Sequence, residues 1–111
     1  GAAVGPCRAV VTDVDGTLFP FGTSRRLSAA NLAALRRALD AGLPVCLATG
    51  RIPGPWSDAL RAQLPGLGPG VFANGALVVG PGGEPLREAV LPQDAVRRVA
   101  AFFRAALLAA T

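Results

Sequence analysis

Two carboxylates stand one residue apart near the start of the chain, and they are the residues best suited to chemistry. Asp13 and Asp15 follow a short apolar run, and the two-residue repeat of a strand places both side chains on the same side. Paired carboxylates at a strand end suit Mg²⁺, which prefers oxygen ligands. One of them can act as a nucleophile that forms an aspartyl-phosphate, while the other serves as general acid and then as base. Gly16 allows a turn in which backbone N–H groups face a phosphate.

Two further polar segments follow apolar runs in the same way. Thr49 offers a hydroxyl and a backbone N–H just before a predicted helix start, where a phosphate dianion is favoured, and Arg51 adds positive charge. Asn74 can donate a side-chain hydrogen bond at the rim of such a site. Each segment also has a purely structural interpretation as a turn, and Asn74-Gly75 is the commonest hairpin-turn dipeptide. The functional hypothesis therefore rests on the three segments together.

The apolar pattern predicts a strand before each of these segments and helices between them. Ser28 is suited to cap a helix whose leucines recur at helical spacing, whereas Pro53 and Pro55 delay the start of the next one. The predicted strands are Arg8 to Thr12, Val45 to Ala48 and Val71 to Ala73, and the predicted helices are Ala29 to Ala41 and Trp56 to Leu64. This alternation favours an α/β fold with a parallel sheet, whose carboxyl strand ends meet at one edge.

A hairpin and a last helix are predicted after the third strand. Ala76 to Val79 and Pro85 to Leu91 flank a Pro-Gly-Gly turn, and Pro92 can begin a helix. An apolar stripe along that helix consists of Val96, Val99, Phe103 and Leu107.

The composition argues against nucleic-acid binding, membrane spanning and zinc binding. The chain has 111 residues, 51% of them hydrophobic, and a net charge of +4 carried on scattered arginines without any lysine. We expect no nucleic-acid partner, because aromatic side chains are not interleaved with the arginines, and no membrane span. Without histidine, two cysteines cannot supply a zinc site. The sequence does not decide whether Cys7 and Cys46 form a disulfide. No signal pattern is found, so a cytoplasmic location is the default expectation.

Three segments together resemble the haloacid dehalogenase (HAD) superfamily in its Cof-type branch. Val10 to Leu18 is similar to the first HAD motif, Leu47 to Arg51 to the second motif in its Ala-Thr-Gly-Arg form, and Phe72 to Ala76 to the Asn-Gly-Ala element of that branch. The resemblance implies a partial Rossmann-like core over residues 1–75. Residues 76–111 then form the hairpin and first helix that lead into an α/β cap domain.

The resemblance also implies roles for individual residues. Asp13 would be the nucleophile and a Mg²⁺ ligand, and Asp15 the general acid/base, with its backbone carbonyl on the metal. Thr49 and Gly50 would hold the transferring phosphoryl group, and the loop over residues 18–27 is similar to the mobile squiggle-and-flap of the family. Known members mostly hydrolyse small phosphorylated metabolites such as sugar phosphates, and the cap selects among them.

Two departures from the family pattern concern the second half of the active site. The family uses a lysine and a later pair of acidic residues, whereas this chain has no lysine and only Asp94 as an acid after Glu88. We therefore expect an incomplete chain that is inactive alone. In the family the first strand is central, so without its outer neighbours Ala9 to Thr12 would form an exposed hydrophobic edge.

Two alternatives stay open. One is a phosphosugar mutase of the same superfamily, which differs in transferring the phosphoryl group to a sugar hydroxyl rather than to water. The other is a catalytically inactive HAD-like module that binds Mg²⁺ or a phosphorylated ligand, or that pairs with a complementing chain or a dimer partner through its open sheet edge.

Overall fold

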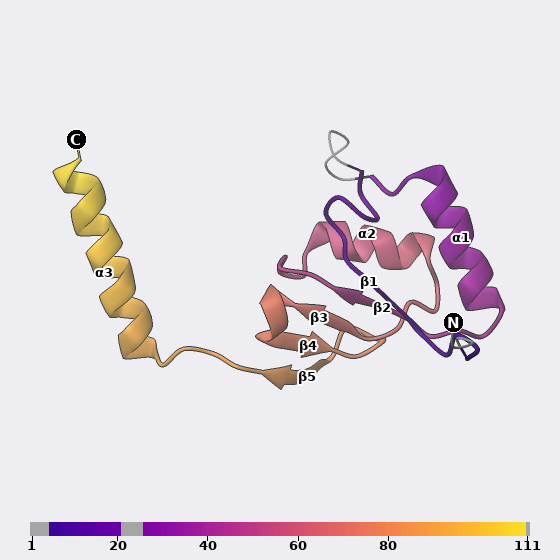
Figure 1. Cartoon of the computed structure of the whole chain (residues 1–111). Helices are drawn as coiled ribbons and strands as arrows, with labels where there is room; N and C mark the ends of the chain where they lie inside the picture. Colours follow the sequence, from indigo (N-terminus) through magenta and orange to yellow (C-terminus); the bar gives the residue numbers. More distant parts are fainter. Residues whose placement is uncertain (1–4, 21–25, 111) are drawn as a thin grey trace.

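A mixed sheet forms the body of the molecule. The computed structural model describes residues 5–20 and 26–110, in which five strands lie in the order β1-β2-β3-β4-β5 (Figure 1). These are β1 (Val10–Thr12), β2 (Val45–Ala48), β3 (Gly70–Phe72), β4 (Leu77–Val79) and β5 (Pro85–Glu88). β1, β2 and β3 are parallel, and β4 and β5 continue the sheet antiparallel to them. The α/β prediction with three parallel strands and a hairpin is confirmed, whereas the division of the chain at residue 75 stays a prediction.

Two helices cover the same face of the sheet. α1 (Ala29–Asp40) connects β1 to β2, and α2 (Pro55–Gln63) connects β2 to β3 (Figure 1). Because side chains alternate along a strand, Val45 and Leu47 of β2 point into the core and are almost fully buried, while Cys46 between them is half-buried. They pack in one cluster with residues of both helices, of the C-cap of α2 and of β3, namely Leu35, Leu60, Leu64 and Phe72.

The opposite face of the sheet is more open. A continuous apolar run like that of the first strand is typical of strands buried on both faces, yet the Val11 side chain is 68% exposed, and Val71 on β3 is 36% exposed. The helices cover one face only, and β1 lies at the edge of the sheet with β2 as its single neighbour in the described residues. The expected exposed hydrophobic edge is therefore present.

The start of α1 is fixed by the predicted cap. The backbone N–H of Asn31 donates to Ser28 Oγ at 3.1 Å, which satisfies one of the N–H groups that a helix start leaves without a partner. We expect Ser28→Ala to lower the free energy of unfolding by about 1 kcal/mol, and Ser28→Asp to lower it by less, because a carboxylate can accept the same bond. Urea titrations of the wild type and both variants measure this, and equal midpoints for the wild type and Ser28→Ala would show that the cap contributes nothing.

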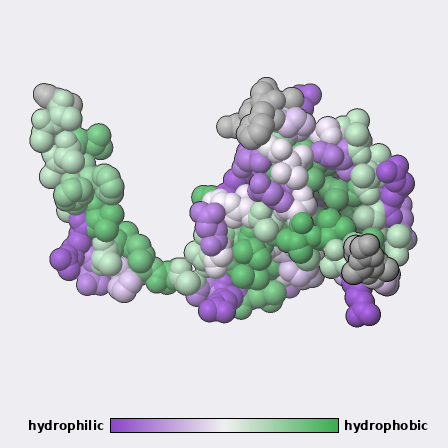
Figure 2. All heavy atoms as spheres, viewed as in Figure 1, coloured by the Kyte–Doolittle hydropathy of each residue, from purple (hydrophilic) through white to green (hydrophobic). Residues whose placement is uncertain are grey.

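α3 (Gln93–Ala109) stands apart from the sheet (Figure 1). The helix begins one residue after the predicted start, with Pro92 as its N-cap, and its side chains are exposed apart from the half-buried Ala95. Hydrophobic residues run along it (Figure 2), including the predicted stripe of Val96, Val99, Phe103 and Leu107. Within the described part of the chain, no helix has the length and apolar character required to cross a membrane.

Two further sequence expectations concern the cysteines and the loop before α1. Both thiols are free, with Cys7 exposed and Cys46 half-buried, so the structure contains no Cys7–Cys46 disulfide. Residues 21–25 of the loop that resembles the squiggle-and-flap lie outside the described residues.

Candidate active site

The carboxyl ends of the three parallel strands bring the three polar segments to one edge of the sheet. Backbone hydrogen bonds join the second and third of them: Asn74 N–H donates to the Thr49 carbonyl at 3.2 Å, and Ala73 N–H donates to the Arg51 carbonyl at 2.8 Å. Ala73 and Asn74 have left-handed φ angles of 49° and 54°, which turn the chain from β3 into β4. The structural and the functional interpretations of Asn74-Gly75 therefore apply to the same turn.

One cavity contains most of the predicted site residues. It has a volume of about 310 Å³ and is lined by Asp13, Ala48, Thr49, Gly50, Val71, Asn74 and Gly75. A Cβ at Gly50 would lie 2.9 Å from Asn74 Oδ1, so a larger residue here would displace the Asn74 amide from its present place. Asp13 is exposed to solvent while the side chain of Thr49 is buried. A carboxylate, a hydroxyl and an amide therefore share a cavity large enough for a phosphate group.

The loop after β1 is held by its own backbone. Val14 is fully buried, and its N–H donates to Asp13 Oδ1 at 2.7 Å, which fixes one oxygen of that carboxylate. Gly16 has a left-handed φ of 74°, and its N–H donates to the Phe19 carbonyl at 2.9 Å. The N–H of Gly16 thus closes the loop instead of facing the cavity, and the glycine contributes its turn rather than a phosphate ligand.

Thr49 lies at the predicted place, but in a different local setting. Its N–H donates to the Val71 carbonyl at 2.9 Å as part of the sheet, so the hydroxyl is the group that it offers to a ligand. The predicted delay of the next helix is confirmed, because α2 begins at Pro55, one residue before the predicted start, with Gly54 as its N-cap. Proline at positions 53 and 55 keeps the intervening residues extended or turned. The start of α2 is therefore not among the residues that line the cavity beside Thr49.

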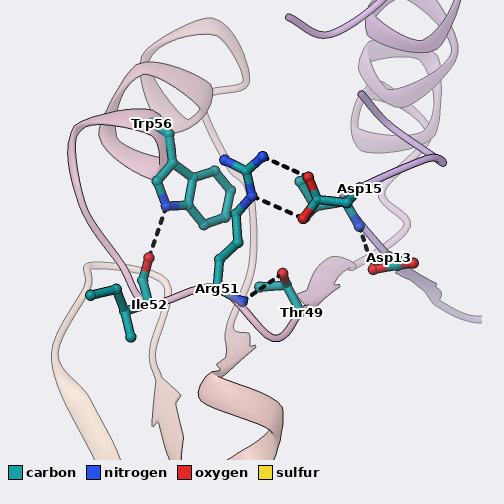
Figure 3. A network of polar contacts seen from close by, with 7 residues as sticks. Asp13, Asp15, Thr49, Arg51, Ile52 and Trp56 are labelled. Carbon is teal, nitrogen blue, oxygen red and sulfur yellow. Dashed lines mark hydrogen bonds and ion pairs between the residues drawn. The ribbon is translucent and has the colours of Figure 1, made fainter. Parts of the chain in front are cut away.

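Arg51 binds Asp15. Its Nε donates to Asp15 Oδ2 at 2.9 Å and its Nη2 to Oδ1 at 2.6 Å, so that both carboxylate oxygens are held by one guanidinium (Figure 3). The guanidinium carbon also lies 5.4 Å from the ring centroid of Phe19 and 5.1 Å from that of Trp56. Arg51 lines a second cavity of about 470 Å³, formed with both aromatic rings, rather than the one that contains Thr49.

This ion pair shifts the pKa values of both residues. The hydrogen bonds from Arg51, with its charge, hold the pKa of the Asp15 carboxyl below its usual range, and Asp15 raises the pKa of Arg51. A carboxyl whose pKa is lower in the folded than in the unfolded protein adds stability above the unfolded pKa, and that stability is lost as the pH falls through the folded pKa. Because the Asp15 side chain is 55% exposed, the contribution is small and is weakened by salt.

The oxygen atoms of Asp13 and Asp15 are suited to be some of the ligands of a Mg²⁺ ion. Among residues 5–20 and 26–110, no three Asp, Glu, His or Cys side chains are grouped closely enough to hold a metal ion. Mg²⁺ binds through one or two carboxylates and keeps several waters, so an incomplete protein cage is not an obstacle. Asp13 lines the cavity, whereas both side-chain oxygens of Asp15 accept bonds from Arg51. The residues present therefore suit the arrangement in which Asp13 binds through its carboxylate and Asp15 through its backbone carbonyl.

Two residues beside this site were missed as functional candidates. The sequence indicated no functional role for Phe19 or Trp56, yet both rings contact Arg51. No spacing rule identifies them, because their approach depends on how residues 50–54 run between β2 and α2. The one available signal was the single tryptophan of the chain, five residues after Arg51.

Comparison with known proteins agrees with this geometry. A family model described as haloacid dehalogenase-like hydrolase matches residues 10–109. A phosphoglycolate phosphatase from Pyrobaculum aerophilum is 54% identical over 43 residues, which are 39% of this chain and 19% of that protein. A HAD phosphatase from Bacteroides thetaiotaomicron has a TM-score of 0.70 at 26% identity, over 94% of this chain and 38% of its own. A HAD subclass IIB sugar phosphatase has a TM-score of 0.66 at 32% identity, over 86% of this chain and 36% of its own.

Proposed function

Because the chain belongs to the haloacid dehalogenase-like hydrolase family, in its Cof-type branch, we propose that it carries the nucleophile half of a Mg²⁺-dependent phosphomonoester hydrolase. The proposed reaction passes through an aspartyl-phosphate on Asp13. The substrate class that we propose is a small phosphorylated metabolite, since the compared relatives are named as phosphoglycolate and sugar phosphatases.

One observation carries this proposal. The Asp13 carboxylate, the Thr49 hydroxyl and the Asn74 amide line a single cavity at the carboxyl ends of parallel strands. Ligands of open parallel sheets bind at this edge. A carboxylate next to neutral hydrogen-bond donors is suited to attack a phosphorus atom while the donors hold its oxygens.

The residues supply a two-step reaction. The cycle starts with Asp15 in its protonated form, which requires that its pair with Arg51 be open in the substrate complex. An oxygen of Asp13 bonds to phosphorus, the ester P–O bond breaks, and Asp15 gives its proton to the departing alkoxide, after which Asp15 is ionised and can pair with Arg51. Asp15 then takes a proton from water, the water oxygen bonds to phosphorus, and the bond between phosphorus and Asp13 breaks. Inorganic phosphate leaves, Asp13 is again a carboxylate, and Asp15 is again protonated. Thr49 and Gly50 hold the phosphoryl oxygens, with Asn74 at the rim.

When bound, Mg²⁺ would neutralise charge on the phosphoryl oxygens. Asp13 and the backbone carbonyl of Asp15 are the groups that would hold it. The chain has no lysine, and it spans 38% and 36% of the lengths of the two solved relatives. We therefore propose that a lysine and an acidic pair from sequence outside these 111 residues complete the site.

Hydrolysis by the natural protein at its full length tests this function. We expect release of inorganic phosphate from small phosphomonoesters, loss of that release with a chelator, and its return with Mg²⁺. Mass spectrometry of protein quenched with acid during turnover should find one added phosphoryl group on the peptide that contains Asp13. The 111-residue chain alone should be inactive, because without a neutralising lysine the carboxylates and the phosphate repel one another.

Other outcomes of this assay separate the alternatives. Transfer of the phosphoryl group to a sugar hydroxyl in preference to water would identify a phosphosugar mutase. Phosphate or Mg²⁺ binding without turnover in the natural protein would identify an inactive binding module. Activity that appears only after a second polypeptide is added would identify a split enzyme.

A further inference from the structure

Two aromatic rings that the catalytic scheme does not use lie against the guanidinium of the Asp15–Arg51 pair. We propose that Phe19 and Trp56 form a clamp on Arg51, and that through Arg51 they are positioning residues that orient the Asp15 carboxylate for the water-activating step. This inference rests on the proposed function, because it concerns the orientation of the general base proposed there.

Both rings of the clamp contact the guanidinium. The Arg51 guanidinium carbon is 5.4 Å from the Phe19 ring centroid and 5.1 Å from the Trp56 centroid, both within the range of a favourable cation–aromatic contact. The two rings meet edge to face, with their centroids 6.2 Å apart. An arginine side chain has many rotamers, and contacts of this kind restrict them. The guanidinium is therefore presented to Asp15 as a fixed fork (Figure 3).

The clamp is in turn anchored to the protein body. Trp56 Nε1 donates to the Ile52 carbonyl at 2.8 Å, and the indole lies 6.0 Å from the ring of Phe72, which is buried in the core. Phe19 is itself buried, with 4% of its surface exposed. The rigidity of the core is thus transmitted to an Asp15 side chain that is otherwise more than half exposed.

The two hydrogen bonds from the Arg51 guanidinium, here called the fork, leave Asp15 able to act as a base. It occupies one lone-pair site on each carboxylate oxygen, and an ionised carboxylate has about four such sites. A water can therefore donate to either oxygen while the fork holds the plane of the group. If the clamp is removed, Asp15 keeps its charge but rotates freely, and a poorly oriented base slows the step in which water attacks the aspartyl-phosphate.

The test is burst kinetics with p-nitrophenyl phosphate on the natural full-length protein. Trp56→Leu keeps an apolar side chain but removes the aromatic face. We expect it to lower kcat by about tenfold, with a burst of p-nitrophenol and KM lowered in proportion, so that kcat/KM is nearly constant. Trp56→Phe should recover most of the loss. Leu86→Ala is the matched control, because that side chain is exposed on β5 and has no part in the clamp, and it should behave as the wild type.

Three results would overturn the clamp. They are an unchanged kcat in Trp56→Leu, a fall of kcat and kcat/KM together without a burst, and an equal loss in Trp56→Phe. A second readout does not depend on turnover: the Arg51 Nε–H resonance of ¹⁵N-labelled protein should exchange slowly with solvent in the wild type and rapidly in Trp56→Leu. Absence of hydrolysis by the wild type would reject the proposed function, while this resonance would still decide whether the clamp exists.

Discussion

Asp13→Asn in the natural full-length protein is expected to lower the rate of phosphomonoester hydrolysis by at least about a thousandfold. The amide cannot form the aspartyl-phosphate, because its oxygen is a far weaker nucleophile than that of a carboxylate. The fold should persist, since the amide oxygen can still accept the bond that Val14 N–H now donates to Asp13 Oδ1 at 2.7 Å. Steady-state rates and the search for a phosphorylated peptide measure both parts of the expectation.

Asp40→Asn is the matched control for this substitution. Asp40 is the exposed last residue of α1, so the same change of charge there should leave the rate within about twofold. Retention of more than a tenth of the wild-type rate by Asp13→Asn would exclude Asp13 as the nucleophile. Equal losses in the two variants would point to an effect of net charge instead of chemistry.

Phe72→Ala is expected to cause a large loss of stability, about 3–5 kcal/mol. Phe72 is one of the largest side chains in the core, with 1% of its surface exposed. Its ring lies over Gly70, where a Cβ would come within 2.5 Å of it, and it also contacts Trp56. Because the surrounding strands are fixed by the sheet, removal of the ring leaves a cavity. Small domains are stable by only about 5–15 kcal/mol, so a substantial part of that stability would be lost.

Urea titration with Val71→Ala as the control tests this expectation. Val71 is the neighbour of Phe72 on β3, but its side chain points to the open face of the sheet and is 36% exposed. We expect Val71→Ala to cost no more than about 1 kcal/mol, and Phe72→Leu to fall between the two. Equal losses for the alanine variants would mean that the two faces of the sheet contribute alike, contrary to the burial pattern.

Much of the fold was determined locally, and the sequence predicted it. The strand Val45–Ala48 was predicted with the correct bounds, and α1 was predicted to within one residue, because Ser28 begins it and Gly42 and Pro44 prevent its continuation. The three polar segments were expected at one sheet edge, and Asp13, Thr49 and Asn74 do share a cavity there. Strand direction and strand ends follow from periodicity and from glycine and proline, which act over a few residues.

The remaining features were decided by contacts between segments far apart in the chain. The apolar run of β1 does not reveal that Val11 is exposed, because exposure depends on which face the helices cover and on the place of β1 in the sheet. The sequence placed Arg51 near the phosphate, whereas its guanidinium binds Asp15, 36 residues earlier in the chain. That pairing requires the path of residues 50–54 and the rings of Phe19 and Trp56. Such contacts are set by packing in three dimensions, which local periodicity does not encode.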